Sequence, residues 1–414
     1  MTADNPNPNS AVNPDVKSGA NRAGAILEID LAVLGANYDI LRHRAAPAEC
    51  AAVLKADAYG LGAAEVGPML AAMGCRTYFV AHLDEGLALR DIVGFGAAIY
   101  VLNGLLPETE TELLAHDLVP VLNTVEQIAQ WSRKARALEQ TLPAALHVDT
   151  GMARLGLSGV DAADLAKAPE ALDGLELHFI ASHLACADEP DHPLNREQRQ
   201  LFHGHLTTLP PAPASLANSS GIFLDPEFHY DLVRPGIALY GGNPTPGAKN
   251  PDNNPMGAVV RLRGKIIQVR EIDTPQSVGY GATHRVTGPR RIATVPVGYA
   301  DGHPRALSGC GMGAINGILI PIVGRVSMDL ITLDITDVPI AVSQPGALVD
   351  LIGGDGPSLD AVAAAAGTIG YEILTSLGRR YHRRYLNGGL NDSLNDGLND
   401  GPNGGIDREE VTDE

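Results

Sequence analysis

The chain of 414 residues is long enough for two or three domains of ordinary size. Hydrophobic residues make up 45% of it and charged residues 19%, as in soluble globular proteins, and no apolar run reaches the roughly 18 residues of a membrane span. The net charge of −19 would repel a nucleic-acid backbone. We therefore expect no membrane and no nucleic-acid partner.

Cysteine and histidine spacing offers no metal or disulfide signature. The cysteines form no CxxC pair and lie far apart, at Cys50, Cys75, Cys186 and Cys310. His178 and His183 differ by an odd number, so on one strand they point to opposite faces. We expect no metal. Because residues 1–24 also lack the basic and apolar regions of a secretory signal, we expect a reduced, cytoplasmic protein.

Both ends of the chain are predicted to be disordered tails. Residues 1–24 are polar and rich in Asn and Pro, so they offer too little apolar surface to offset the entropy lost on ordering. From residue 387 to residue 414, Leu recurs with a period of four among Asn, Gly and Asp, and Gly and Asn disfavour the helix that this period suggests. Eight acidic residues against one Arg give this tail a charge of −7.

Eight short apolar runs alternate with segments of helical period between the tails. The runs cover residues 49–56, 77–81, 97–104, 118–123, 144–151, 175–183, 213–219 and 229–241. Segments between them, such as 124–140, place apolar residues at spacings of three and four, as amphipathic helices do. We predict an α/β fold with a (β/α)8 TIM barrel over residues 25–255. A doubly wound open sheet is the alternative, disfavoured because no GxGxxG motif opens the first unit.

A segment rich in Pro, Asn and Gly, residues 243–257, marks a change in the chain. Strand-like stretches follow it, among them RRIATVPVGY and GALVDLIGG. We predict a second, mainly β domain over residues 256–386.

Candidate functional residues follow the predicted barrel strands, where a barrel carries its catalytic residues. They are Lys55, Asp57, Tyr59 and Gly60 after strand one, Asp149, Gly151 and Arg154 after strand five, His183 after strand six, Asn218 and Ser219 after strand seven, and Arg234, Gly236 and Ile237 after strand eight. The carboxyl end of the barrel is therefore the predicted site.

Three of these groups suggest a chemistry, each with a plainer alternative. Lys55 shares a strand face with apolar residues, which would lower its pKa and favour a Schiff-base nucleophile, or it is a solvated lysine at a strand end. Ser219 and Gly236 resemble a phosphate cup, or they lie in two ordinary loops. Arg234 would pair with a buried anion or a ring nitrogen, or it forms a surface salt bridge.

Nine motifs in order resemble the landmarks of alanine racemases, which are fold-type III enzymes dependent on pyridoxal 5′-phosphate. They are VLKADAYGLG, HVDTGMARLG, ASHLACADEP, ANSSG, LVRPGIALYG, VGYGAT, VPVGYADG, GRVSMD and GYEIL. The resemblance covers about residues 25–386. It is specific because nine motifs in the right order are far less probable by chance than any one of them.

The resemblance implies a role for each matching residue. Lys55 would hold the cofactor as an internal aldimine and act as one base, and Tyr280 would be the second base on the opposite face of the substrate. The implied phosphate contacts are Tyr59, Ser219, Gly236, Ile237 and Tyr371, with Asn218 in the same ANSSG motif. Arg234 would pair with the pyridine nitrogen, with His183 behind Tyr280 and Arg154 nearby. Met328 would bind the substrate carboxylate through its backbone N–H, or it is a core residue of the β domain, and Arg154 would also bind the substrate. Asp188, Tyr299 and Arg325 would line a narrow access corridor.

One position departs from the family pattern. The motif DTGM commonly follows a lysine that is carbamylated to place a negative charge beside the arginine, whereas this chain has His147 there. An imidazole cannot carry that charge, so either a bound anion such as chloride replaces it or Arg154 is held in another way. Asp57, where many members have Asn, is a milder change.

The sequence thus predicts an alanine racemase that interconverts L- and D-alanine and supplies D-alanine for peptidoglycan. The alternatives are a racemase of other or broader amino-acid specificity, and a non-catalytic barrel that binds the same cofactor. The resemblance also implies a homodimer whose sites combine Lys55 of one chain with Tyr280 of the other.

Overall fold

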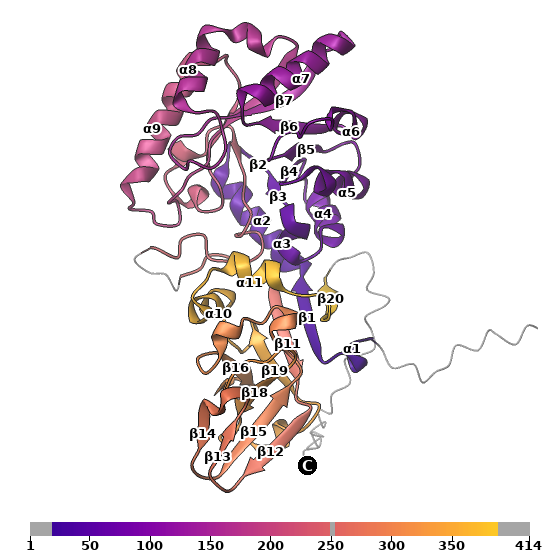
Figure 1. The fold of residues 1–414 in the computed structure, drawn as a ribbon, viewed down its shortest axis with the longest axis vertical. Helices are drawn as coiled ribbons and strands as arrows, with labels where there is room; N and C mark the ends of the chain where they lie inside the picture. The colour runs from indigo at the N-terminus through magenta and orange to yellow at the C-terminus, as the bar shows by residue number, and fades with distance from the viewer. Residues whose placement is uncertain (1–18, 249–252, 388–414) are drawn as a thin grey trace, which may run out of the picture.

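The computed structural model describes residues 19–248 and 253–387 (Figure 1). A ring of parallel strands with helices around it forms one end of the elongated molecule, and a strand-rich part forms the other. The predicted order of an α/β barrel and a mainly β part is confirmed. No helix in the described ranges is both long and apolar enough to span a bilayer.

Seven strands of the ring form one parallel sheet in chain order, from β3 to β9. The ring strands are β2 (Glu49–Cys50), β3 (Ala52–Val53), β4 (Thr77–Val80), β5 (Ala98–Val101), β6 (Leu118–Leu122), β7 (Leu142–His147), β8 (Leu175–Ala181), β9 (Ala214–Ser215) and β10 (Leu232–Val233). β10 pairs in parallel with β2, which β3 continues after one residue. Because the backbone N–H of Asp231 also donates to Ala214 O, β10 bridges β9 and β2 and closes the ring.

Helices cover the outside of the ring. They are α2 (Leu31–Ala45), α4 (Ala63–Ala72), α5 (Leu83–Val93), α6 (Glu110–Ala115), α7 (Val125–Leu138), α8 (Gly159–Lys167) and α9 (Pro193–Thr208), with the 3₁₀ turns η1 (Pro169–Leu172), η2 (Gly221–Phe223) and η3 (Pro226–Phe228). The predicted helix within 124–140 is α7, whose buried residues Ile128, Trp131 and Ala135 recur at spacings of three and four. Thr124 caps it by accepting a hydrogen bond from the backbone N–H of Gln127.

The mainly β part holds a six-stranded sheet in the order β17-β16-β19-β11-β1-β20, a three-stranded sheet β12-β15-β18 and the hairpin β13-β14. Its strands are β1 (Ala25–Asp30), β11 (Val260–Lys265), β12 (Gln268–Ile272), β13 (Gln276–Val278), β14 (His284–Val286), β15 (Arg290–Val295), β16 (Met312–Ile315), β17 (Ile318–Pro321), β18 (Ile331–Asp334), β19 (Leu348–Ile352) and β20 (His382–Leu386). Its 3₁₀ turns are η4 (Tyr280–Ala282), η5 (Tyr299–Asp301), η6 (Arg305–Leu307) and η7 (Ile340–Val342).

β1 does not follow the predicted grouping, which assigns residue 25 onward to the barrel. It lies between β11 and β20 in the sheet of the other part. Ala25 through Ile29 are all buried, so this strand needs an interior position in a sheet with both faces covered. Pairing between segments so distant in the chain is not visible in local sequence pattern.

Residues 19–24, predicted to belong to the N-terminal tail, include the short helix α1 (Gly19–Arg22). Lys265 Nζ donates hydrogen bonds to the carbonyl oxygens of Ala20 and Asn21, which ties this turn to β11. The rest of the predicted tails, residues 1–18 and 388–414, and residues 249–252 of the predicted linker lie outside the described residues.

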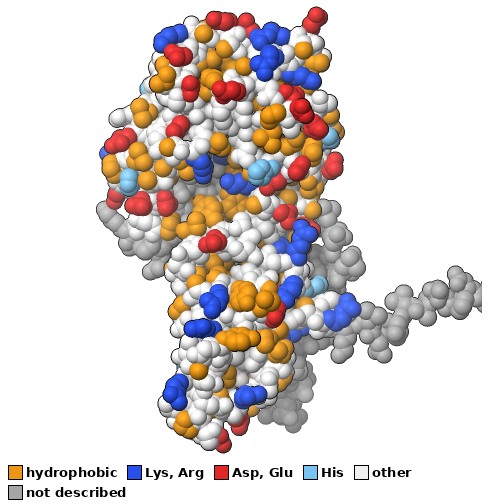
Figure 2. All heavy atoms as spheres, viewed as in Figure 1, with side chains coloured by type: hydrophobic (Ala, Val, Ile, Leu, Met, Phe, Trp, Pro, Cys, Tyr) orange, Lys and Arg blue, Asp and Glu red, His pale blue; other side chains and the backbone are white. Residues whose placement is uncertain are grey.

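Two helices, α10 (Leu359–Ala366) and α11 (Gly370–Ser376), lie between the barrel and the sheets of the β part (Figure 1). α11 contacts α3 (Lys55–Gly60), the turn that begins at Lys55. Arg383 donates a 2.6 Å hydrogen bond to Gly60 O, and Tyr385 donates one to Leu61 O. In the space-filling view, hydrophobic side chains gather where the two parts meet (Figure 2). The turn after Lys55 is therefore fastened to the β part.

Candidate active site

A cavity of about 780 Å³ opens at the carboxyl ends of the barrel strands and extends to α10 and α11. It brings together most of the residues that the sequence singles out. Those lining it are Lys55, Tyr59, Arg154, His183, Asp188, Asn218, Ser219, Arg234, Gly236, Ile237 and Tyr371. His147, the position that departs from the family pattern, lines it as well.

Lys55 leaves β3 and leads into an uncommon backbone turn. The four residues after it, Ala56 to Tyr59, all have φ between 53° and 56° and therefore form a left-handed helical turn. Such backbone costs about 1–2 kcal/mol per non-glycine residue, so the surroundings must hold it in place. Asp57 helps to do this, because its Oδ1 accepts a 2.7 Å hydrogen bond from Ala63 N.

The charge state of Lys55 follows from its surroundings. Burial of the amine and repulsion by Arg154 lower its pKa, whereas Glu85 raises it. A lowered pKa increases the fraction of neutral amine, which is the form that attacks a carbonyl carbon or accepts a proton. This favours the nucleophile over the solvated strand-end lysine.

Ser219 and Gly236 meet at the closing strands of the ring. Ser219 Oγ accepts hydrogen bonds from Gly236 N at 2.8 Å and Ala238 N at 3.2 Å, which leaves its own proton free to donate. A side chain at position 236 would overlap the Tyr59 hydroxyl, so only glycine allows this close approach. The ring of Tyr59 lies 4.7 Å from that of Tyr240, and this packing fixes its hydroxyl beside the turn. The hydroxyl groups of Ser219 and Tyr59 therefore lie beside Gly236 as a small cradle of donors suited to an anion.

Arg234 is a buried cation that faces the cavity. It is 6% exposed, and its guanidinium donates to Ser215 Oγ and, at 2.6 Å, to Ser182 O. Burial lowers its pKa to about 10, which still leaves it protonated at neutral pH. Among the residues described here it has no carboxylate partner, so the surface salt bridge considered for it does not form.

The two histidines of the cavity are neutral near pH 7. Burial and the nearby Arg234 lower the pKa of His183 well below its usual value, and the same two causes lower the pKa of His147 to about 4. Asn123 uses its amide Nδ2 to donate to two backbone carbonyls, so its Oδ1 accepts the 2.7 Å bond from His147 Nδ1. This leaves His147 Nε2 without a proton and able to accept a hydrogen bond.

Four predicted residues do not reach this cavity within the chain. Tyr280, Tyr299 and Met328 are 73%, 44% and 53% exposed, and Arg325 is also exposed. Two contacts of their chain neighbours place them together on the β part. Beside Tyr280, a Cβ at Gly281 would be 3.0 Å from the guanidinium carbon of Arg325. Beside Tyr299, Ala300 N donates a hydrogen bond to Met328 O. We call these four residues the Tyr280 group.

Two residues with a clear place in the site were not singled out from the sequence, Glu85 and Asn123. Glu85 is three residues after the N-cap of α5, in the spacing of a capping box. Asn123 directly follows β6, so the rule that barrel strands end in functional residues could have found it.

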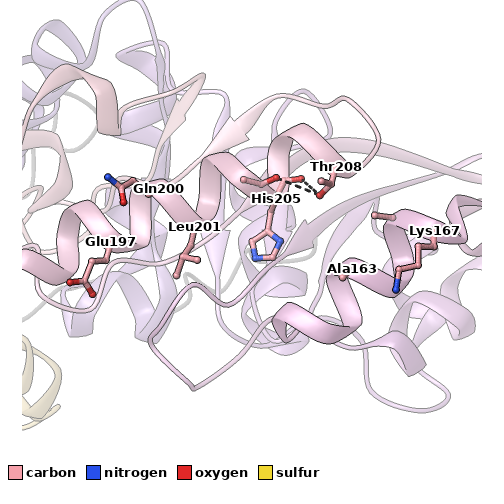
Figure 3. Close-up of a pocket in the computed structure, with 9 residues that line it drawn as sticks. Ala163, Lys167, Glu197, Gln200, Leu201, His205 and Thr208 are labelled. Carbon is pink, nitrogen blue, oxygen red and sulfur yellow. Dashed lines mark hydrogen bonds between the residues drawn. The ribbon is translucent and has the colours of Figure 1, made fainter.

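A second hollow, of about 990 Å³, lies between α8 and α9 on the outside of the barrel (Figure 3). Its polar groups are paired locally or open to solvent. Lys167 pairs with Asp164, the hydroxyl of Thr208 donates to the carbonyl of His205, and Glu197 is exposed. None of the predicted site residues lines it, so we assign the chemistry to the cavity at the strand ends.

Comparisons with known proteins match both parts of the chain. Residues 29–244 match the family model for the alanine racemase N-terminal domain, and residues 259–385 match that for the C-terminal domain. The chain is 52% identical to the alanine racemase of Rhodospirillum rubrum, covering 88% of this chain and 96% of that protein. It is 50% identical to a catabolic alanine racemase of Agrobacterium fabrum, covering 89% and 93%.

A solved structure agrees with these sequence matches. The alanine racemase of Bartonella henselae, crystallised with covalently bound pyridoxal phosphate, superposes with a TM-score of 0.84 at 42% identity. The match covers 88% of this chain and all of that one.

Proposed function

The chain belongs to the alanine racemase family, and from that premise we propose that it interconverts L- and D-alanine at the cavity that holds Lys55. The observation that carries the proposal is the meeting of three features in one cavity. These are a lysine of lowered pKa, a cradle of the Ser219 and Tyr59 hydroxyls beside Gly236, and the buried cation Arg234.

These residues fit pyridoxal 5′-phosphate. The cradle beside Tyr59 suits its phosphate, and Arg234, which has only donors, suits the ring nitrogen and leaves that nitrogen unprotonated. Lys55 would attach the cofactor covalently through its amine. When bound, the cofactor draws electrons from the α-carbon of an amino acid and so makes its α-proton acidic.

Racemisation requires that a proton leave one face of the α-carbon and return to the other. Lys55 Nζ is placed to exchange a proton on its side of the cavity. Among the residues that the structure describes, His183 of the same chain is a weak second base, because burial and the nearby Arg234 lower its pKa and so disfavour its protonated form. We assign the second proton transfer to the hydroxyl of Tyr280 from another copy of the chain. Met328 and Arg154 would bind the substrate carboxylate. Asp188, Tyr299 and Arg325 would line the corridor through which the substrate reaches the cavity.

Charge supports this dimer. Residues 31–255 contain 14 Lys and Arg against 27 Asp and Glu, whereas residues 25–30 and 256–386, which form the β part, contain 13 against 12. A strongly negative barrel repels a nearly neutral β part far less than it repels a second barrel, so charge favours head-to-tail association of two copies. We further propose a cytoplasmic homodimer that supplies D-alanine for peptidoglycan. Because one relative is named as catabolic, a catabolic role is the alternative.

The proposal is tested with the purified protein. We expect a visible absorbance band, a borohydride-reduced adduct on Lys55 alone, and racemisation of L-alanine well above that of L-serine and L-lysine in a chiral assay. An adduct on another lysine would refute the role of Lys55. Comparable rates on all three amino acids would favour the broader specificity, and absorbance without turnover would favour the non-catalytic barrel.

A further inference from the structure

Glu85 connects a helix of the barrel to the turn that follows Lys55. It lies in the first turn of α5, where its carboxylate accepts three backbone hydrogen bonds. Oε2 accepts from Ala81 N at 2.7 Å and from His82 N at 3.1 Å. Oε1 accepts from Ala56 N at 2.6 Å, and this bond crosses from α5 to the neighbouring strand end.

The bond to Ala56 is made at the start of the left-handed turn. Ala56 has φ 55° and ψ 44°, and it is the first of the four left-handed residues that follow Lys55. Strained backbone of this kind persists only where its surroundings determine it. The direction in which Lys55 leaves β3 therefore depends on the carboxylate of Glu85.

The same carboxylate acts on the amine of Lys55. Burial and Arg154 lower the pKa of that amine, and Glu85 opposes them. Glu85 is thus linked to Lys55 both through the backbone and through charge.

A capping-box glutamate is often no more than a helix cap. In this chain, however, Oε2 alone satisfies the two N–H groups at the start of α5, and Oε1 is left for Ala56. We propose that Glu85 is a positioning residue, which fixes the backbone after Lys55 so that its amine points into the cavity and which holds a negative charge beside that amine. The proposal rests on the role of Lys55 in the proposed function.

Four substitutions separate reach, charge and helix capping. Glu85→Gln keeps the size and removes the charge, whereas Glu85→Asp keeps the charge and is one methylene too short to hold Ala56. Asp84→Asn is the matched control, because it removes an exposed carboxylate from the same turn. Thr124→Ala removes a different helix cap, that of α7, and controls for lost stability alone.

The first measurement is the pH dependence of acetylation of Lys55 by acetic anhydride, followed by peptide mass in the full chain freed of cofactor. We expect Glu85→Gln to become reactive at lower pH than wild type and to react several-fold faster at pH 7. Asp84→Asn and Thr124→Ala should match wild type. This readout does not depend on turnover, so it remains decisive even where the proposed function fails.

The second measurement is kcat and KM of the holoenzyme. Glu85→Asp should lower kcat about tenfold with little change in KM, because a misdirected amine slows proton transfer without touching substrate. If both Glu85 variants change only the urea midpoint, as Thr124→Ala does, then Glu85 is a helix cap and the proposal is wrong. Should Glu85→Gln not accumulate as folded protein, the kcat and KM of Glu85→Asp decide the matter.

Discussion

At the scale of single residues, the cavity carries more cations than carboxylates. Lys55, Arg154 and Arg234 line it, against Asp188 and Asp360. The nearby carboxylate of Asp149 is taken up by three backbone N–H groups of its own loop. Burial, and after it the charge of Arg234, makes a positive charge on His147 costly, so that histidine is held neutral. A cavity of this charge suits a ligand with phosphate and carboxylate groups.

The first prediction concerns His147. Because the imidazole of His147, hydrogen-bonded to Asn123, has no amine that carbon dioxide could carbamylate, activity should not depend on dissolved carbon dioxide. The measurement is alanine racemisation in buffer freed of carbon dioxide, with and without added bicarbonate, and a chloride titration that tests whether an anion fills the gap. Loss of activity without carbon dioxide and its recovery with bicarbonate would contradict the prediction.

The second prediction is a pH dependence of stability from His303. This residue is 2% exposed, and burial lowers its pKa to about 4. In the unfolded chain this histidine has a pKa of about 6.5, so as pH falls the unfolded state binds the proton first. The contribution of His303 to the free energy of unfolding is therefore fully present above about pH 6.5 and is lost as the pH falls to about 4. We expect the free energy of unfolding to fall by about 3 kcal/mol from this group. Urea titrations at pH 7 and pH 4.5 should show a smaller fall for His303→Leu than for wild type.

At the scale of helices and strands, the local sequence pattern predicts those features that depend on residues close in the chain. The period of α7 and the polar residues at strand ends are visible in sequence because burial of one face and exposure of loop groups are repeated regularly. The left-handed turn after Lys55 is not visible in the sequence. Ala, Asp and Tyr prefer right-handed backbone, and only contacts from distant residues, such as that of Glu85, reverse the preference. The partners of β1 are hidden for the same reason, because β11 and β20 lie more than two hundred residues away.

The third prediction tests the cradle formed by β9 and β10. In Gly236→Ala the new methyl group would displace the Tyr59 hydroxyl, and overpacking of this kind costs about 1–3 kcal/mol. Pyridoxal 5′-phosphate should therefore bind about tenfold more weakly or worse. Equilibrium dialysis of the cofactor against wild type measures this. Gly96→Ala is the matched control, because no atom lies within 4 Å of its new methyl group, and equal affinities for the two variants would contradict the proposed cradle.

At the scale of the whole molecule, the described chain separates its predicted functional residues into two groups. One group lines the barrel cavity, and the Tyr280 group lies exposed on the β part. Exposed Tyr and Met side chains gathered in one place are typical of an interface. A second copy that covers the barrel mouth with its β part would bury this surface and complete the site.

The last prediction is that Lys55→Ala and Tyr280→Ala complement each other. Each variant alone should be almost inactive, because every site lacks one of two bases. After equal amounts are mixed and subunits exchange, half of the dimers are hybrids, and each hybrid has one site with both bases and one with neither. Activity should then recover to roughly a quarter of wild type, as expected for a closed two-fold dimer with shared sites. If both bases came from one chain, every site in every mixture would lack a base. Native mass spectrometry verifies that subunits have exchanged. If activity then does not recover, the shared site is refuted and a different second base is required.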